Sequence, residues 1–198
     1  VTLNGLYMLV AQAKESAEYF SGTTISNEKI KDVYCSLKLQ MENIILIGMP
    51  GSGKSTIGAM VAKALGRQFV DTDQLIVERV KMSIPDYMEK YGLERFRQEE
   101  SSFIRDISKQ SGLIIATGGG CVTREDNYRP LHQNGTVIWV NQPICKLSTE
   151  GRPLSVSGNL EDMYTARSPL YAHVADLQID NGAEPEKAVG TILKVLKG

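Results

Sequence analysis

The most specific chemical pattern in this sequence is GMPGSGKS at positions 48–55, which matches the P-loop pattern G-x-x-x-x-G-K-[ST]. An apolar run at 44–47 precedes the loop and an alanine-rich segment follows it, as a strand and a helix would. The loop glycines permit a tight turn whose backbone N–H groups converge on phosphate. Lys54 is placed to reach the β- and γ-phosphates, and the Ser55 hydroxyl to bind Mg²⁺. The alternative is a glycine-rich turn with an unrelated lysine.

Two carboxylates stand two residues apart in FVDTD, at positions 69–73, where a second apolar segment ends. We expect Asp71 to face the metal of the P-loop and Asp73 to face an acceptor molecule. A carboxylate close to a hydroxyl can act as the base when an alcohol is phosphorylated. The alternative is a polar loop in which Asp73 only caps a helix that begins at Gln74.

A third apolar strand, at 113–117, runs into three consecutive glycines at 118–120. In many P-loop proteins the corresponding strand ends in an aspartate that holds the metal, but this one ends in Thr117. Metal support then falls to Ser55 and Asp71. Glycines are entropically costly to order, which makes sense if another group must approach the backbone closely. The alternative is a flexible turn.

Arginines supply candidate contacts for an anionic substrate. Arg97 and Glu100 are three residues apart and share one face of a predicted helix. This spacing ordinarily indicates a solvated ion pair; the functional alternative is a guanidinium that Glu100 holds for a carboxylate, which arginine binds through two N–H groups. Arg167 is a second candidate for that carboxylate, near a helix boundary that we expect Pro169 to set.

A polar stretch from 148 to 160 contains Gly151, Arg152 and Pro153. A glycine before an arginine that proline stiffens is typical of a mobile lid. From such a lid Arg152 can offset the charge of a transferring phosphoryl group. The alternative is an exposed arginine in an ordinary loop.

These segments need a scaffold, and the hydrophobic pattern from position 44 onward predicts alternating strands and helices. Strands are expected at 44–48, 68–71, 113–117, 136–140 and 176–180. Helices are expected at 54–65, 74–81, 84–91, 93–110, 159–167 and 185–197. The alternation indicates an α/β fold whose parallel sheet is covered on both faces. Because ligands bind beyond the carboxyl ends of parallel strands, the P-loop, the FVDTD segment and the glycine run should meet at one cleft.

Residues 1–41 follow the pattern of a helical hairpin. Asn4 is a candidate cap for a first helix that ends near Gly22, and Ser26 is one for a second helix. The second helix carries one unbroken apolar stripe, formed by Ile30, Val33, Tyr34, Leu37 and Met41. The predicted organisation is therefore a hairpin at 1–41, with an apolar face that must pack on something, and a catalytic domain at 42–198.

The composition is that of a soluble globular protein and excludes several classes of function. The 198 residues are 42% hydrophobic and carry a formal net charge of −1, so no global basic field exists to hold nucleic acid. No apolar run approaches the length of a membrane-spanning helix. The three cysteines are odd in number and lack C-x-x-C spacing, which indicates a reducing cytoplasm rather than a disulfide framework or zinc site.

Residues 41–198 resemble the shikimate kinase family, in the nucleoside-monophosphate-kinase-like branch of P-loop folds. The matching motifs follow the family's order: GMPGSGKST at 48–56, DTD at 71–73, FRQEE at 96–100, TGGG at 117–120, GRPL at 151–154 and RSPLY at 167–171. The resemblance implies a three-layer fold with a five-stranded parallel sheet of order 2-3-1-4-5, substrate-binding helices and a lid. It also implies Mg²⁺-dependent transfer of the ATP γ-phosphoryl group to the 3-hydroxyl of shikimate, in chorismate and aromatic amino acid biosynthesis.

The same resemblance implies a role for each motif residue. The expected catalytic residues are Asp73, the base, with Lys54 and Arg152. The expected ATP-binding residues are Gly48, Gly51, Ser52, Gly53, Lys54, Ser55, Thr56 and Pro185. The expected shikimate-binding residues are Asp73, Arg97, Gly118, Gly119, Gly120 and Arg167. Mg²⁺ is expected on Ser55 and, through water, on Asp71. Two departures from the family's pattern, a shortened stretch from 152 to 167 and Ser155, affect the lid but remove no reacting group.

The front segment carries a second resemblance. NGLYMLVAQA at 4–13 is similar to the C-terminal helices of shikimate dehydrogenase, where the residue that matches Gln12 contacts shikimate. With a first residue Val1, this implies that the chain is a fragment of a fused dehydrogenase–kinase. No G-x-G-x-x-G unit is present, so we expect no dehydrogenase activity. The alternative is an unrelated helical extension.

Two rival functions stay open at this point. One is another small-metabolite P-loop kinase, of the gluconate or nucleotide type, although two arginines placed for a carboxylate favour shikimate. The other is a non-catalytic nucleotide-sensing module. The absence of the N-K-x-D run of GTPase switches and the presence of acceptor-site residues speak against a sensor.

Overall fold

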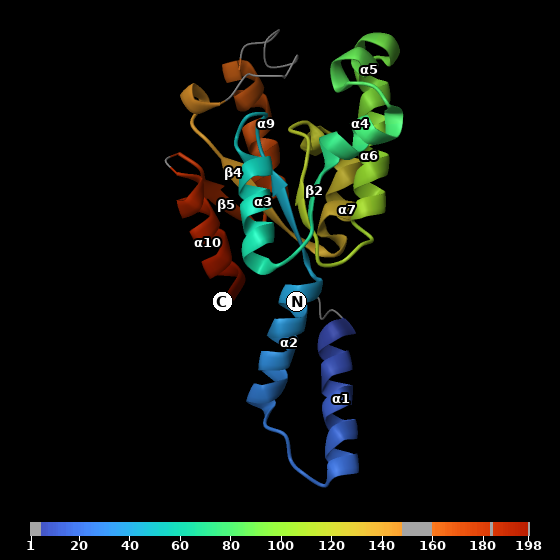
Figure 1. Cartoon of the computed structure of the whole chain (residues 1–198), viewed down its shortest axis with the longest axis vertical. Helices are drawn as coiled ribbons and strands as arrows, with labels where there is room; N and C mark the ends of the chain where they lie inside the picture. The colour runs from blue at the N-terminus through green and yellow to red at the C-terminus, as the bar shows by residue number, and fades with distance from the viewer. Residues whose placement is uncertain (1–4, 148–159, 183, 198) are drawn as a thin grey trace. The chain divides into compact units, whose positions relative to one another are not determined.

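A computed structural model describes residues 5–147, 160–182 and 184–197 (Figure 1). The chain divides into two compact units, Val1–Met41 and Glu42–Gly198. Arg152 and residues 148–159 of the polar stretch predicted to form a lid lie outside the described residues, as does Asn4, the predicted cap of the first helix. No helix in the described ranges is both long enough and apolar enough to cross a lipid bilayer.

The second unit is built on five parallel strands in the order β2-β3-β1-β4-β5. The strands are β1 (Asn43–Ile47), β2 (Phe69–Asp71), β3 (Ile114–Ala116), β4 (Gly135–Asn141) and β5 (Leu177–Asp180). Ile45 in the central strand is level with Ile115 on one side and Val137 on the other. The predicted parallel sheet and its strand order are therefore confirmed.

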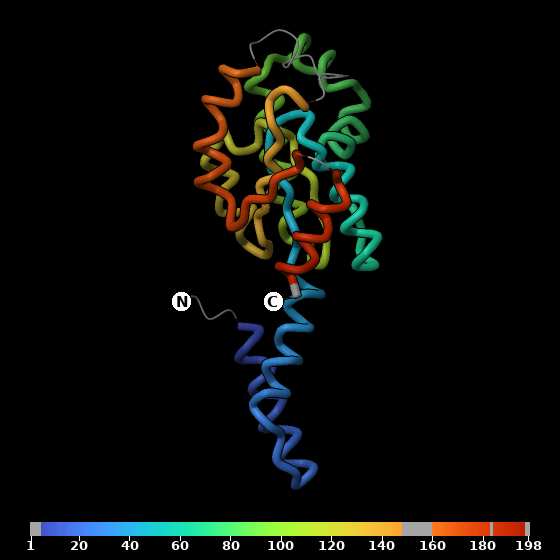
Figure 2. Tube along the Cα trace, turned by 90° about the vertical axis from the view of Figure 1, so that its left-hand side faces the viewer, coloured from blue at the N-terminus to red at the C-terminus, as the bar shows by residue number. Residues whose placement is uncertain are grey.

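Alternate side chains of the strands enter two separate cores, which explains why the runs at 44–47 and 114–116 are apolar at every residue. Ile45 and Ile47 pack toward α6 (Leu93–Ile107), α7 (Tyr128–Gln133) and α9 (Leu160–Val174). Ile44 and Leu46 pack toward α3 (Lys54–Leu65) and α10 (Pro185–Lys197). Figure 1 shows α3 and α10 in front of the sheet, and the turned view in Figure 2 shows α9 in orange and α10 in red on opposite sides of it.

Helices α4 (Thr72–Val80) and α5 (Ile84–Tyr91) pack with α6 around a third core of Ile76, Tyr87, Phe96 and Phe103. Helix α4 begins two residues before the predicted position, because Asp71 is its N-cap and accepts a 3.0 Å hydrogen bond from the Asp73 backbone N–H. The alternative in which Asp73 caps this helix is wrong. Helix α6 ends at Ile107, three residues before the predicted end.

The predicted helix boundary at Pro169 is wrong. Helix α9 continues to Val174 with Pro169 inside it, and Arg167 lies within the helix. Proline removes one helical hydrogen bond and crowds the preceding turn, so tertiary contacts must compensate. Tyr171 and Val174, which lie beyond the proline, are buried against the sheet and supply such contacts. The short helix α7 and the 3₁₀ turns at Cys121–Thr123, Glu125–Asn127 and Ile144–Lys146 were not predicted.

The first unit is an antiparallel pair of helices, α1 (Gly5–Ser21) and α2 (Asn27–Met41). Tyr7 and Tyr34 meet edge to face at 5.4 Å, and the Lys14 ammonium donates to Asn27 Oδ1 at 2.9 Å. Within this unit the buried apolar side chains among the described residues are Val10 and Ile30. Tyr19 and Phe20, at the end of α1, are each 85% exposed.

Candidate active site

A cavity of about 480 Å³ lies beyond the carboxyl ends of β1, β2 and β3. The P-loop, the residues after β2 and the glycine run after β3 meet there, as their positions after neighbouring strands predict. Helices α5, α6 and α9 complete the wall. The lining residues are Pro50, Gly51, Gly53, Lys54, Ser55, Thr56, Asp71, Asp73, Ile84, Pro85, Met88, Phe96, Arg97, Glu100, Thr117, Gly118, Gly119, Gly120 and Arg167.

The P-loop backbone binds the side chain of its own lysine. Lys54 is 7% exposed, and its ammonium donates to the carbonyls of Gly48 at 3.0 Å and Met49 at 2.8 Å. Gly53, with φ of 87°, is the N-cap of α3 and directs the first turn of that helix into the cavity. The helix N-terminus and its unpaired N–H groups favour an anion there. A phosphate chain laid along this loop would meet both the helix and the Lys54 ammonium.

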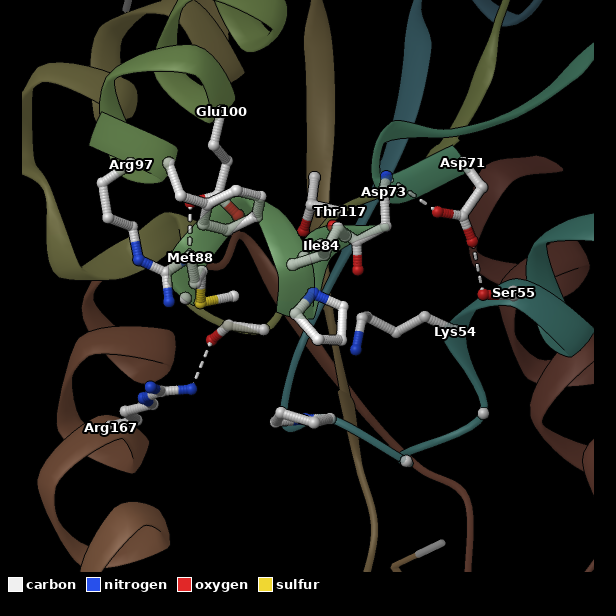
Figure 3. Close-up of a pocket in the computed structure, with 18 of the residues that line it drawn as sticks. Lys54, Ser55, Asp71, Asp73, Ile84, Met88, Arg97, Glu100, Thr117 and Arg167 are labelled. Atoms are coloured by element: carbon white, nitrogen blue, oxygen red, sulfur yellow. Dashed lines mark hydrogen bonds and ion pairs between the residues drawn. The ribbon is translucent and has the colours of Figure 1, made fainter. Parts of the chain in front are cut away.

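Ser55 and Asp71 form the polar end of the cavity. The Ser55 hydroxyl donates to Asp71 Oδ2 at 2.6 Å, and Asp71 Oδ1 accepts the Asp73 N–H, so both carboxylate oxygens are held (Figure 3). A hydroxyl and a carboxylate are oxygen donors of the kind that Mg²⁺ prefers, with water and phosphate as its remaining ligands. No group of three or more potential metal-binding side chains is present in the described parts of the chain. The donor set therefore fits Mg²⁺ that a phosphate substrate brings.

Each glycine of the run after β3 faces a different close neighbour. A Cβ at Gly118 would lie 2.7 Å from Asp73 Oδ1 and would also collide with Glu100 Oε1. One at Gly119 would lie 2.6 Å from Pro50 Cδ, and one at Gly120 would overlap the Arg97 guanidinium. The run therefore brings two carboxylates, the P-loop and an arginine against the backbone.

The glycine run is also anchored where it begins. The Gly118 N–H donates to the Thr72 hydroxyl at 3.2 Å, and the Thr117 hydroxyl donates to the Leu46 carbonyl at 3.1 Å. These bonds fasten the run to the start of α4 and to the central strand. They argue against the flexible-turn alternative.

The arginine at position 97 is held inside the protein. Its Nη1 lies 2.6 Å from Glu100 Oε2, and the Arg97 and Glu100 side chains are only 10% and 0% exposed. The solvated ion pair considered from the spacing is therefore wrong. Arg167 lines the same cavity and donates from Nη1 to the Gly119 carbonyl at 3.2 Å. In Figure 3 both arginines lie on one side of the cavity, Lys54 and Ser55 lie on the other, and Asp73 lies between them.

Burial raises the pKa of Glu100 from its ordinary value of 4.5, and Arg97 opposes this shift while Asp73 adds to it. The folded protein therefore binds the proton of the Glu100 carboxyl more tightly than the unfolded chain does. The stability that this proton contributes is fully present below pH 4.5 and is lost as the pH rises through the raised pKa of the folded state. We expect the free energy of unfolding of the wild type, relative to Glu100→Gln, to fall over this interval by at most about 1.4 kcal/mol per pH unit, and then to level off. Urea unfolding across the pH range measures it, and a difference that does not vary with pH would contradict it.

The cysteine beside the glycine run, Cys121, is an unreactive thiol. Cys121 is fully buried, its thiol donates to the Thr117 hydroxyl at 3.2 Å, and burial raises its pKa to about 12. Cys35 and Cys145 are exposed. Because the thiolate is the reactive form, we expect a disulfide reagent to modify two thiols quickly in the folded protein and the third only after unfolding. Spectrophotometric counting of released thiolate checks this, and three fast thiols would contradict it.

The remaining predicted residues lie elsewhere. Gly48 and Ser52 belong to the P-loop but do not line the cavity, and the buried Ser52 carbonyl accepts a 2.9 Å hydrogen bond from Asn181. Pro185 begins α10 and also lies off the cavity wall. Sequence reasoning missed the apolar wall, which consists of Ile84, Pro85, Met88 and Phe96. The signal available was the amphipathic pattern of α5 and α6, but it does not tell which apolar side chains face a ligand.

Comparisons with known proteins agree with this geometry. The family model of shikimate kinase matches residues 50–197. A shikimate kinase of Nitrosomonas europaea is 39% identical over 155 residues, which cover 74% of this chain and 74% of the relative. One of Bordetella avium is 38% identical over 162 residues, covering 77% of this chain and 76% of the relative. The solved structure of the shikimate kinase of Acinetobacter baumannii in complex with shikimate has a TM-score of 0.76 and 31% identity, covering 82% of this chain and 96% of that one. The chain belongs to the shikimate kinase family.

Proposed function

We propose that this protein transfers the γ-phosphoryl group of ATP to the 3-hydroxyl of shikimate, giving shikimate 3-phosphate and ADP. One observation carries the proposal: a single cavity holds a P-loop lysine at one side, a pair of arginines at the other, and the Asp73 carboxylate between them. The family membership and the shikimate complex of the Acinetobacter baumannii relative support this choice of acceptor.

The P-loop side is proposed to bind the nucleotide. Phosphate would replace the Gly48 and Met49 carbonyls as the partner of the Lys54 ammonium, and the first turn of α3 would donate backbone N–H groups to it. Mg²⁺, when bound, would neutralise phosphate charge next to Ser55 and the Asp71 carboxylate. Arg152, which lies outside the described residues, remains the candidate from the predicted lid that offsets charge on the transferring group.

The arginine side is proposed to bind the acceptor. Arg97 and Arg167 bind the carboxylate of shikimate, Gly118, Gly119 and Gly120 allow the ring to lie against the backbone, and the apolar wall of α5 and α6 excludes water. In the chemical step the 3-hydroxyl oxygen forms a bond to the γ-phosphorus, the bond from that phosphorus to the bridging oxygen breaks, and ADP leaves. Asp73 accepts the proton of the hydroxyl.

The direct test is ADP release in a coupled assay with shikimate as acceptor, compared with gluconate and with nucleoside monophosphates. Turnover that depends on shikimate is the expected result. Turnover with gluconate or a nucleotide alone would support a kinase of another specificity. ATP binding without turnover on any acceptor would support a nucleotide sensor.

We further propose that residues 42–198 form the catalytic unit and that residues 1–41 derive from the C-terminal helices of a shikimate dehydrogenase in a fused natural chain. The support is the NGLYMLVAQA motif and the helical form of α1 and α2. Sequencing the natural transcript upstream of the Val1 codon tests the fusion, because a stop codon in frame would exclude it. The cysteines at 35, 121 and 145 are free thiols, which fits the reducing cytoplasm in which we place the enzyme.

A further inference from the structure

Two side chains of α9 donate to one backbone oxygen in the glycine run. The Tyr171 hydroxyl lies 2.5 Å from the Gly119 carbonyl oxygen, and Arg167 Nη1 lies 3.2 Å from the same atom. Positions 167 and 171 are four residues apart, so both side chains leave the same face of the helix. A carbonyl oxygen has two lone pairs and can accept both bonds.

The two bonds differ in whether their donors can move. Tyr171 is 0% exposed, stacks on Trp139 with ring centroids 5.7 Å apart, and has its hydroxyl 3.9 Å from Met49 Sδ. Burial also raises the pKa of the Tyr171 hydroxyl, so it remains a donor. Arg167 instead lines the cavity, and a guanidinium has five N–H donors for use there. The tyrosine bond is therefore fixed, and the arginine bond is exchangeable.

We propose that Tyr171 is a positioning residue for the acceptor: its fixed bond to the Gly119 carbonyl lets Arg167 release that oxygen and turn toward a carboxylate. This inference rests on the proposed role of Arg167 in binding the acceptor. Without the Tyr171 hydroxyl, the partly buried Gly119 carbonyl has no hydrogen-bond donor left once the Arg167 guanidinium moves away. Leaving that carbonyl unsatisfied costs free energy each time shikimate binds. Arg167 is then held by the protein and competes poorly for the substrate.

The variant Tyr171→Phe removes the hydroxyl and keeps the ring on Trp139. We expect the KM for shikimate to rise about tenfold, the scale of one hydrogen bond, while the KM for ATP and kcat change less than about twofold. The matched control is Tyr128→Phe, which removes a hydroxyl that donates to the Val122 carbonyl at 3.1 Å, outside the cavity lining. An unchanged KM for shikimate, or an equal rise in the KM for ATP, would overturn the proposal.

A double-mutant cycle then tests whether Tyr171 acts through Arg167. In an Arg167→Ala background we expect Tyr171→Phe to raise the KM for shikimate by less than about twofold, because no guanidinium remains to be released. Multiplication of the two single effects would overturn the mechanism. The wild type is assayed first with shikimate, so a failure of the proposed function appears as missing wild-type turnover and is distinct from either outcome of the cycle.

A measurement on the wild type avoids any dependence on how the variant folds. The only adjacent glycines in the sequence are at 118–120, so protein labelled with carbonyl ¹³C and ¹⁵N at glycine gives two carbonyl–amide signals, one for each Gly–Gly peptide bond, and the signal that joins to the Gly120 amide reports the Gly119 carbonyl. We expect shikimate alone to move this carbonyl resonance upfield, because one of its two donors leaves. A resonance that stays in place at saturating shikimate would show that Arg167 does not exchange, and would overturn the proposal.

Discussion

The variant Asp73→Asn is expected to lower kcat with shikimate by about 100-fold or more, the scale of losing a positioned base. Asparagine fills the same space beside Gly118 but cannot take the proton of the acceptor hydroxyl. Asp73 lies in the first turn of α4, on the wall between the P-loop lysine and the two arginines. The KM for ATP should change little, because Lys54 and the P-loop backbone are untouched.

The control for this variant is Glu78→Gln, which removes a carboxylate from the exposed part of the same helix and should leave kcat unchanged. Loss of the Asp73 charge near a helix N-terminus also costs about 0.3–1 kcal/mol of stability, which thermal unfolding will show as a small drop in Tm. Rapid-quench measurement of a single turnover separates the chemical step from product release. A wild-type rate in that experiment would remove Asp73 from the role of base.

The part of this structure that the sequence predicts best is the sheet and the cleft at its edge. Positions 44–47 and 114–116 of the central strands are apolar at every residue because helices cover both faces of the sheet, and this local pattern is visible in the sequence without knowledge of the neighbouring segments. Once the strands are parallel and alternate with helices, the segments that follow them must converge. The P-loop, Asp73 and the glycine run were therefore found from positions in the chain alone.

What the sequence could not show depends on contacts between distant segments. Pro169 favours a helix end by its local chemistry, yet α9 passes through it because Tyr171 is held by Trp139 and by the Gly119 carbonyl. The burial of Glu100 is likewise invisible in an i,i+3 spacing, which is the same for a solvated pair and for a buried one. The apolar wall was missed because Met88 and its neighbours have the same amphipathic pattern whether they face the protein core or a ligand.

The second large effect is expected at Arg97, where replacement by alanine should raise the KM for shikimate at least about 30-fold. The charge pair that is lost here joins the Arg97 guanidinium to the carboxylate of bound shikimate. Truncating one partner of a buried, hydrogen-bonded charge pair of this kind typically costs about 2–5 kcal/mol of binding free energy, and 2 kcal/mol corresponds to roughly a 30-fold change. Arg97 lines the cavity but lies across it from Lys54 in Figure 3, so the KM for ATP should stay near its wild-type value. Steady-state kinetics with each substrate varied in turn measure the split.

Two comparisons separate a contact with the acceptor from damage to the fold. Arg95→Ala changes an arginine of the same helix whose side chain is 59% exposed and pairs with Glu99, and it should have no effect on either KM. Arg97→Ala also leaves Glu100 buried without its partner, and adding Glu100→Gln removes that uncompensated charge. We expect the second substitution to recover part of the lost stability but none of the lost affinity for shikimate. Recovery of the KM for shikimate in the double variant would mean that Arg97 stabilises the helix and does not contact the acceptor. A rise in KM confined to ATP would mean that Arg97 contacts the nucleotide and not shikimate.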